Sequence, residues 1–217
     1  LKQEEKISKP KNNVYVIEFD GDIKASNVSN LRQEVSAVLS IATKKDKVVI
    51  VIESPGGTVN GYGLAASQLS RIRDNGIPLI ACVDKIAASG GYLMAAVANE
   101  IIAAPFSIIG SIGVVAQIPN FHRLLKKHNI DFELLTAGEY KRTLTMLGEN
   151  TTQGREKFTE DLEAIHTLFK NHLQENRSQI NIEQVSTGEH WLAKDALKLN
   201  LVDCLLTSDE YLSQHID

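Results

Sequence analysis

From Val14 onward, short apolar runs alternate with amphipathic stretches, and this pattern predicts repeated strand and helix units. The runs VYVIEF (14–19) and VVIVIE (48–53) are rich in β-branched residues and predict strands. The second run has almost no polar position, as expected of a strand that is covered on both faces. The residues between the two runs that recur on one helical face are Val28, Leu31, Val35, Val38 and Leu39. The pattern therefore predicts an α/β fold.

The alternation continues through the middle of the chain. Residues 64–73 predict a helix, and PLIACVD (78–84) predicts the strand that follows it. The apolar residues at 121–125 predict a short helix, and DFELLT (131–136) predicts a further strand. The middle of the chain thus extends the same α/β pattern.

The last third of the chain changes character. From Gly154 onward a single apolar stripe with charges opposite predicts one long helix. The members of this stripe are Phe158, Leu162, Ile165, Phe169 and Leu173. Near the end, ALKLNLVD (196–203) predicts a helix that Asn200 ends in a left-handed conformation, with a strand from Val202. We therefore expect a helical C-terminal layer.

The chain contains no internal repeat or low-complexity tract. We interpret residues 14–206 as a single domain, 1–13 as a polar tether that breaks at Pro10, and 207–217 as a C-terminal tail. Leu1 is not an initiator methionine, and a polar start of this kind is expected between a preceding segment and a domain.

Charge and composition exclude several classes of protein. The 27 acidic and 23 basic side chains give a formal charge of −4, and the pI is near 5.9. Without a long Lys/Arg stripe there is no electrostatic footprint for nucleic acid. No run of about 18 apolar residues is present, so the chain as given does not span a bilayer.

The two cysteines do not indicate a disulfide scaffold or a metal site. Cys82 and Cys204 lie among apolar residues, without a CxxC motif or a histidine at ligand spacing. Buried small hydrophobes are the simplest interpretation of both. We therefore expect no metal and no cofactor.

The first candidate site is Ser54-Pro55-Gly56-Gly57, which lies between a predicted strand and a predicted helix. Glycines at a strand end let the backbone turn an N–H toward a ligand, and such an N–H can bind a developing oxyanion. A plain turn explains the same four residues.

The second candidate site, Ala88-Ser89-Gly90-Gly91-Tyr92, opens an almost wholly apolar helix, 92–98. Ser89 is the one hydroxyl of its small-residue segment, at a helix N-terminus that favours negative charge. A helix-capping serine is the alternative. Together, however, two Gly-rich strand ends can supply two oxyanion donors beside a nucleophile.

A nucleophilic serine needs a base. The histidines are His122, His128, His166, His172, His190 and His215. None has an obvious orienting carboxylate in a Gly-rich turn, which a Ser-His-Asp triad would require. Lys141, in TAGEYKR after the predicted strand, is the alternative. A lysine is usually a surface charge and acts as a base only where burial lowers its pKa.

Five segments together carry a family resemblance: ESPGG, AASGGYLMA, GSIGV, AGEYKR and ALKLNLVD. Their order and spacing resemble the signal peptide peptidase A family of serine proteases (peptidase family S49), and specifically its SohB branch. The resemblance covers about Val14 to Leu206.

The resemblance implies a role for each matching residue. Ser89 corresponds to the nucleophile and Lys141 to the general base, and Ser111 of the GSIGV motif corresponds to the serine that orients the lysine amine. The N–H groups of Gly57 and Gly90 correspond to the oxyanion donors.

The family belongs to the wider ClpP/crotonase fold, a spiral of strand-strand-helix units. ClpP uses a histidine about 25 positions after its serine, but this chain has none between Ser89 and His122 and so agrees with the Ser/Lys pattern. Asn200 stands where the family commonly has Gly, and Asn tolerates the same backbone conformation.

The resemblance implies a serine endopeptidase that cleaves peptides or unfolded protein segments. Members are membrane-anchored, so an N-terminal anchor outside this chain is expected, with the catalytic domain on the periplasmic side of the bacterial cytoplasmic membrane. A crotonase-like acyl-CoA enzyme with the same oxyanion hole is the alternative, and a protease-like scaffold is a non-enzymatic one. Apolar residues near the serine, Ile86, Leu93 and Met94, are compatible with a hydrophobic P1 pocket or with simple helix burial.

The position of Lys141 predicts an assembly. The lysine lies in a weakly patterned polar segment, 137–154, where an amine is hard to dehydrate unless another surface covers it. We therefore expect a neighbouring copy to cover this segment in a cyclic, head-to-tail homo-oligomer, with the helix from Gly154 near the contact. By resemblance, the Ser/Lys pair is completed across that interface.

Overall fold

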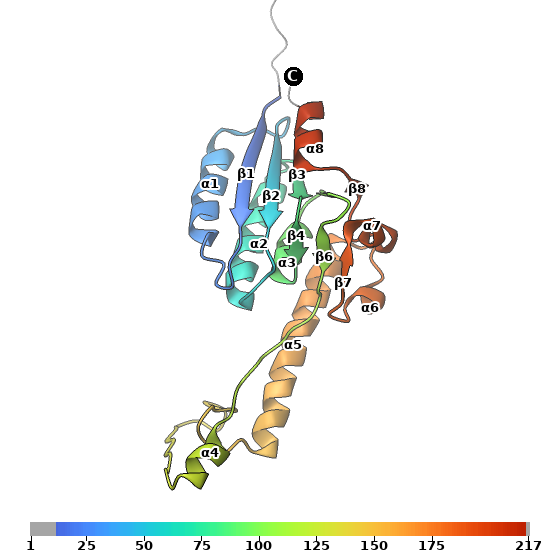
Figure 1. Cartoon of the computed structure of the whole chain (residues 1–217). Coiled ribbons are helices and arrows are strands. Elements are labelled where there is room, and N and C mark those ends of the chain that lie inside the picture. The colour runs from blue at the N-terminus through green and yellow to red at the C-terminus, as the bar shows by residue number, and fades with distance from the viewer. Residues whose placement is uncertain (1–11, 216–217) are drawn as a thin grey trace, which may run out of the picture.

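The computed structural model describes residues 12–215, and its centre is a five-stranded parallel sheet (Figure 1). The expected tether, 1–13, lies almost entirely outside the described residues. The strands follow the order β1 (Val14–Asp20), β2 (Lys47–Glu53), β3 (Leu79–Val83), β5 (Glu100–Ala103) and β8 (Cys204–Leu205). All neighbouring strands in this sheet run parallel, so the predicted α/β pattern is confirmed.

Both faces of the sheet are covered, as the apolar run in β2 predicted. Helices α1 (Val28–Ile41) and α2 (Val59–Asp74) pack on the face that Ile50 faces. Val49 faces the opposite side, where it packs in a smaller cluster with Tyr211. Because α8 (Ser208–His215) carries Tyr211, the segment expected to be a C-terminal tail contains a helix that packs on the sheet.

A second, three-stranded sheet continues from the first. Its order is β4 (Ile86–Ala88), β6 (Ile108–Gly110) and β7 (His190–Leu192), with β4 and β6 parallel and β7 antiparallel. A single bridge between Ser54 and Ala87 connects the end of β2 to β4. The two sheets are therefore joined at the first candidate site, although the chain itself passes from one sheet to the other between β3 and β4.

The C-terminal third is mainly helical, as predicted. It contains α5 (Thr152–Asn176), α6 (Ile182–Val185), α7 (Ala193–Ala196) and the 3₁₀ turn η1 (Leu197–Leu199). Asn200 ends this turn at φ 60°, in the left-handed conformation that the sequence indicated. The strand that follows begins at Cys204, two residues later than predicted.

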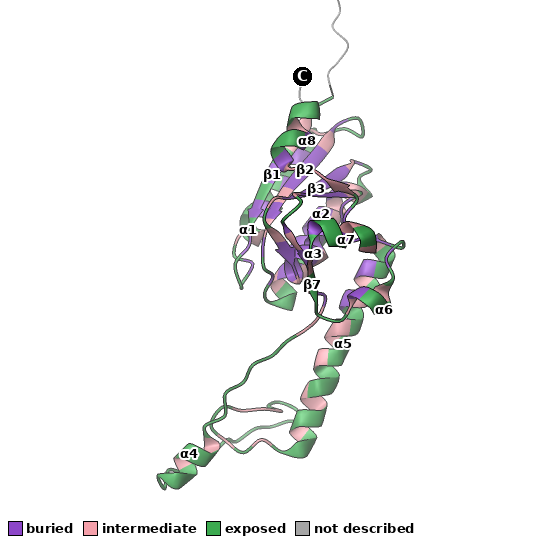
Figure 2. Cartoon of the chain, turned by 45° about the vertical axis from the view of Figure 1, so that its right-hand side comes forward, coloured by how far each residue is buried: buried purple, intermediate pink, exposed green. Residues whose placement is uncertain are grey.

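Residues 116–164, called the arm below, extend away from the rest of the molecule, called the body (Figures 1 and 2). The arm contains α4 (His122–Lys127) and the N-terminal half of α5, and none of its residues is buried. Residues 131–136, predicted to form a strand, form none. Among residues 12–215 no neighbouring strand satisfies their backbone groups, and Leu135 is 90% exposed. That prediction was therefore wrong.

Candidate active site

Ser89 and Ser111 lie side by side because they follow paired residues in neighbouring parallel strands. Ala88 of β4 is in register with Gly110 of β6, and each serine is the next residue along its strand. The Ser89 N–H donates to the Gly110 carbonyl over 2.7 Å. Adjacent strands are about 4.8 Å apart, and ligands bind outside the carboxyl ends of parallel strands. The two strands thus place both hydroxyls at one edge.

Ser89 has a strained backbone that presents its side chain between strand β4 and helix α3 (Gly90–Ala95). Its φ of 51° and ψ of −117° lie outside the regions that residues with a side chain ordinarily occupy. The hydroxyl makes no capping bond to α3, so the alternative of a helix-capping serine is not realised. A sharp strand-to-helix turn of this kind exposes the hydroxyl of a nucleophilic serine.

Two backbone N–H groups face the same cleft as Ser89. Among residues 12–215, neither the Gly57 N–H nor the Gly90 N–H donates to an acceptor. A Cβ atom on Gly90 would collide with the ring of Tyr62, and one on Gly57 with the carbonyl of Ile23. Glycine is therefore required at both positions by close approach, and within residues 12–215 both N–H groups can still donate to a ligand oxygen.

A hydrogen-bond chain that the sequence analysis missed holds the loop of Gly57. The Gly56 N–H donates to Ser54 Oγ (3.1 Å), which lies 2.6 Å from the Tyr62 hydroxyl. The Tyr62 hydroxyl donates to the Asp22 carbonyl over 2.7 Å. Burial raises the pKa of Tyr62, so the phenol stays protonated. The position of Tyr62 on the apolar face of α2 was the available signal, but by itself it indicates only core packing.

These groups line one cleft of about 1010 Å³ between α2, α5 and the strand ends. Segments 113–115 and 186–188 form its other walls. Of the three apolar residues considered for a P1 pocket, Leu93 lines the cleft, whereas Met94 is fully buried in the core and Ile86 is not part of the lining. Within residues 12–215, no group of three His, Cys, Asp or Glu side chains is arranged to hold a metal ion.

Two histidines that the sequence placed on a polar-faced helix line this cleft. His166 and His172 lie on the part of α5 that packs against the body. His172 Nε2 is 3.0 Å from the Leu93 carbonyl, and burial lowers the pKa of its imidazole. His166 Nε2 is buried without a hydrogen-bond partner in the described part of the chain. Neither imidazole contacts a carboxylate among residues 12–215, so no triad is formed.

Lys141 lies apart from the other candidate residues. It belongs to the arm, it is exposed, and it does not line the cleft that contains Ser89 and Ser111. Its backbone N–H donates to the Gly138 carbonyl in a turn, rather than following a strand as the sequence indicated. One chain therefore brings together Ser89, Ser111, Gly57 and Gly90, but it does not bring Lys141 to them.

The fold and the cleft define an α/β protein of the ClpP/crotonase-like type, with a strained serine beside two free N–H groups. Sequence comparison agrees with this class. The pattern of peptidase family S49 matches residues 71–215, and that of the N-terminal part of the same family matches residues 1–69. The chain belongs to peptidase family S49.

Several relatives carry the description of a probable protease SohB. Identity is 56% over 199 residues with the protein from Haemophilus influenzae, covering 92% of this chain and 56% of that protein. It is 58% over 202 residues with the protein from Buchnera aphidicola subsp. Acyrthosiphon pisum, covering 93% and 60%. A chloroplastic serine protease SPPA of Arabidopsis thaliana is 31% identical over 170 residues, covering 75% and 24%. The chain thus spans little more than half the length of these SohB relatives.

Solved structures share the fold. The membrane-bound stomatin-specific protease 1510-N, as a serine-to-alanine mutant, has a TM-score of 0.60 at 18% identity, covering 94% of this chain and 84% of that one. A lysine-to-alanine mutant of the same protease in complex with a substrate peptide has a TM-score of 0.59, covering 95% and 81%. The expected ClpP/crotonase-like fold is therefore confirmed.

Proposed function

We propose that this chain is the catalytic part of a serine endopeptidase that cleaves peptides or unfolded protein segments, with Ser89 as nucleophile. The observation that carries the proposal is the strained backbone of Ser89 between the free N–H groups of Gly57 and Gly90. Backbone strain of this kind persists only where the surrounding structure enforces it, and strained residues cluster at active sites.

In the proposed reaction, Ser89 Oγ bonds to the substrate carbonyl carbon while its proton passes to a base. The oxygen that gains negative charge accepts hydrogen bonds from the Gly57 and Gly90 N–H groups. The C–N bond then breaks, the base returns the proton to the leaving amine, and an acyl ester remains on Ser89. Water then attacks this ester while the same base takes its proton. The bond between the acyl carbon and Ser89 Oγ breaks, the base returns the proton to Oγ, and the acid is released.

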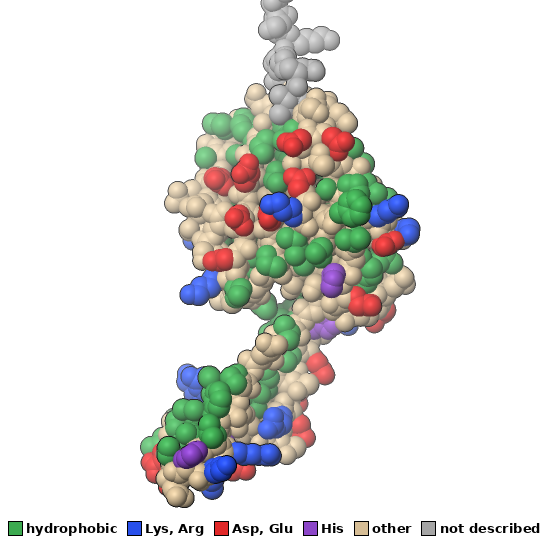
Figure 3. Space-filling view, in the orientation of Figure 1, with side chains coloured by type: hydrophobic (Ala, Val, Ile, Leu, Met, Phe, Trp, Pro, Cys, Tyr) green, Lys and Arg blue, Asp and Glu red, His purple; other side chains and the backbone are tan. Residues whose placement is uncertain are grey.

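Lys141 is the proposed base, and a neighbouring copy supplies it. Lys141 lies on an arm with no buried residue, so one chain alone offers its amine no dry environment. Exposed apolar side chains gather on the same arm (Figure 3); they include Phe121, Leu124, Ile130, Phe132, Leu134 and Leu135. Clusters of exposed apolar side chains mark protein interaction sites. Seating the arm on a second copy would cover this surface and bring Lys141 to Ser111 and Ser89, in a contact of more than about 1,000 Å².

Mixing two inactive variants tests the shared site. A site built from two copies needs Ser89 from one and Lys141 from the other, so S89A and K141A proteins assembled together should regain up to about a quarter of wild-type activity. Each variant alone, reassembled in the same way, is the control. No recovery, together with full activity of a monomer by light scattering, would contradict the shared site.

The pH profile separates a lysine base from the histidines of the cleft. A lysine base works only when unprotonated, so kcat/KM should rise from neutral to mildly alkaline pH. A profile governed by a group near pH 6.5 would implicate a histidine instead. The variants H166Q and H172Q, measured over the same range, identify which histidine is responsible in that case.

Thioester chemistry is the competing function for the same oxyanion site. A crotonase-like enzyme needs the two N–H donors but neither Ser89 nor a lysine base. If the chain is an endopeptidase, the S89A variant should lose peptide cleavage and should no longer react with a serine-reactive probe. Retained acyl-CoA turnover by S89A would favour the crotonase-like alternative.

The proposed location is the periplasmic side of the bacterial cytoplasmic membrane, reached through an N-terminal anchor in the whole protein. A fold relative is described as a membrane-bound protease. Within residues 12–215, no helix has the length and hydrophobicity of a membrane span. Fractionation of cells that make the full-length protein, followed by protease treatment of spheroplasts, tests the membrane association and the side.

A further inference from the structure

We infer that the ion pair between Arg177 and Asp203 is a positioning device: it sets the direction of the arm and thereby places Lys141 in the cleft of a neighbouring copy. This inference rests on the shared site proposed above. It concerns residues that touch neither the substrate nor the reacting atoms.

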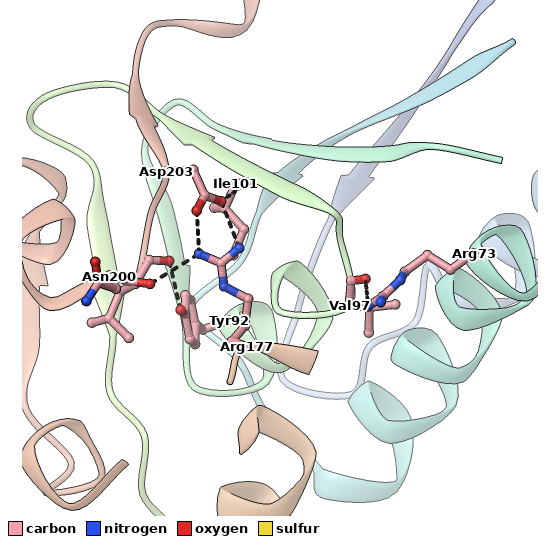
Figure 4. A network of polar contacts seen from close by, with 8 residues as sticks. Arg73, Tyr92, Val97, Ile101, Arg177, Asn200 and Asp203 are labelled. Atoms are coloured by element: carbon pink, nitrogen blue, oxygen red, sulfur yellow. Dashed lines mark hydrogen bonds and ion pairs between the residues drawn. The ribbon is translucent and has the colours of Figure 1, made fainter. Parts of the chain in front are cut away.

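Arg177 follows α5 directly and is held by a two-pronged contact (Figure 4). Its Nη1 lies 2.7 Å from Asp203 Oδ2, and its Nη2 lies 2.8 Å from Asp203 Oδ1. Nη2 also donates to the Asn200 carbonyl over 3.1 Å. The arginine side chain is only 3% exposed. A paired contact of this kind fixes orientation as well as distance, because both N–H groups must align with the carboxylate.

Asp203 transmits this orientation to the central sheet. The Ile101 N–H of β5 donates to Asp203 Oδ2 over 2.7 Å, and the Asp203 N–H donates to the Ile101 carbonyl over 2.8 Å. A second tether lies one residue earlier in α5, where Arg73 Nη1 donates to Asn176 Oδ1 (2.8 Å) and to the Val97 carbonyl (2.6 Å). The C-terminal end of α5 is thus tied to the body at two points.

Because α5 is long and is buried only near its C-terminal end, a small change of tilt at that end moves the arm by a large distance. The helix has 25 residues and is therefore about 37 Å long. Its buried residues, Phe169 and Leu173, both lie near the C-terminal end. A tilt of about 5° at that end displaces the other end by roughly 3 Å. Misplacement of a reacting group by about 1 Å already costs on the order of 100-fold in rate.

The helix that follows Ser89 is hydrogen-bonded to the same turn of the body, at residues 200–201. Tyr92, three residues after Ser89, donates its hydroxyl to the Leu201 carbonyl over 2.8 Å. Arg177 bonds to the carbonyl of the preceding residue, Asn200. Both helices are therefore tied to one turn, but the Tyr92 bond involves neither Arg177 nor Asp203, so the helix that begins beside Ser89 keeps its own tie when the ion pair is lost. In a symmetric assembly, every copy therefore presents its serine and its arm in the same relative orientation.

Mixed assemblies separate positioning from a general effect on folding. In a mixture of S89A and K141A proteins, the S89A copy provides the arm and the K141A copy provides the serine. The change Arg177→Lys, which keeps the charge but removes the fork, is placed on one or the other copy. We expect the recovered kcat to fall at least tenfold when it is on the arm donor and less than twofold when it is on the serine donor, with KM unchanged.

A second variant and a control accompany this test. Asp203→Asn breaks the same ion pair while keeping the size of the side chain, and it should give the same asymmetry. Lys198→Ala removes the exposed ion pair with Asp195 and should give none. Activities are compared below the melting temperature of every variant, with assembly size measured by light scattering.

The outcomes are distinct for the two proposals. If the S89A and K141A mixture without further changes regains no activity, the shared site is overturned, and the positioning role of the ion pair with it. Recovery that both placements of Arg177→Lys reduce equally shows that the ion pair serves only folding, and so does failure of both variants to fold. Loss confined to the arm donor supports the positioning role.

Discussion

The body and the arm differ in how firmly they hold the candidate active-site residues. Ser89, Gly57 and Gly90 are held by strand pairing, by a fully buried Tyr62 and by contacts that leave no room for a Cβ atom. Lys141 lies on an arm without a buried residue, joined to the body by one extended segment and one helix. A single chain thus determines the geometry around Ser89, the proposed nucleophile, whereas it leaves Lys141, the proposed base, exposed on the arm.

The largest expected effect comes from removing either member of the proposed Ser/Lys pair. S89A and K141A should each lower kcat by about 10⁴-fold, as loss of a nucleophile or base commonly does. Neither side chain contributes to the apolar core, so the melting temperature of both should stay within about 2 °C of wild type. Steady-state cleavage of an unstructured peptide and thermal unfolding are the measurements. Near-normal cleavage by either variant would contradict the mechanism.

Leucines from the two regions should differ sharply in their effect on stability. Leu173 is fully buried where α5 meets the body, so Leu173→Ala should lower the free energy of unfolding by about 2–5 kcal/mol. Leu135 of the arm is 90% exposed, and Leu135→Ser should change it by less than about 0.5 kcal/mol while weakening assembly. Urea unfolding and light scattering check both. A stable assembly of the Leu135→Ser protein would show that this leucine lies outside the contact.

The close fit around Gly90, a proposed oxyanion donor, gives a further test. Gly90→Ala forces a Cβ atom against the Tyr62 ring, so the Gly90 N–H must shift and kcat should fall about 10²–10³-fold. Gly63, on the neighbouring helix α2, also lines the cleft but has no atom within 4 Å of an added Cβ. Gly63→Ala is therefore the control for adding a methyl group without a collision, and it should stabilise the fold by up to about 1 kcal/mol. Equal activity of the two variants would exclude Gly90 as a donor.

The smallest expected effect is a pH dependence of stability from His172. Burial lowers the pKa of this imidazole in the folded chain. In the unfolded chain a histidine takes up a proton near pH 6.5, which the folded chain resists, so stability falls as the pH drops below that value. Between pH 7.5 and pH 5, His172→Gln should lose less stability than wild type. His128→Gln, from an exposed position of the arm, is the matched control, and an equal loss in all three proteins would contradict the assignment.

Many strands and turns of the body could be predicted from the sequence, because each depends on residues that are neighbours in the chain. An apolar run such as residues 48–53 requires cover on both faces wherever it lies, and Gly-rich segments at strand ends mark turns with free N–H groups. The sequence therefore indicated that Ser89 and Gly57 lie at strand ends, and both line the cleft; their chemical roles stay predictions. The strand at 131–136 could not be judged in the same way, since a strand forms only with a partner, and the arm offers none.

Other features of the site depend on contacts between residues far apart in the chain. His166 and His172 line the cleft only because α5 packs beside α2 and α3, and the sequence alone indicated a polar helix face. The C-terminal segment looked like a tail because its helix is short, yet Tyr211 fills the second face of the sheet. No periodicity within either segment reports which surface it will meet.

The sequence by itself determined the alternation of strands and helices and the two glycine-rich strand ends, the second of which contains Ser89, because these follow from short-range apolar periodicity and backbone freedom. Tertiary structure alone decided that Ser111 stands beside Ser89, through the register of β4 and β6. It also decided that Lys141 stands apart from both, because α5 extends past the body with only its C-terminal end buried. Strand register and the direction of a long helix are set by packing between distant segments, which no local pattern encodes.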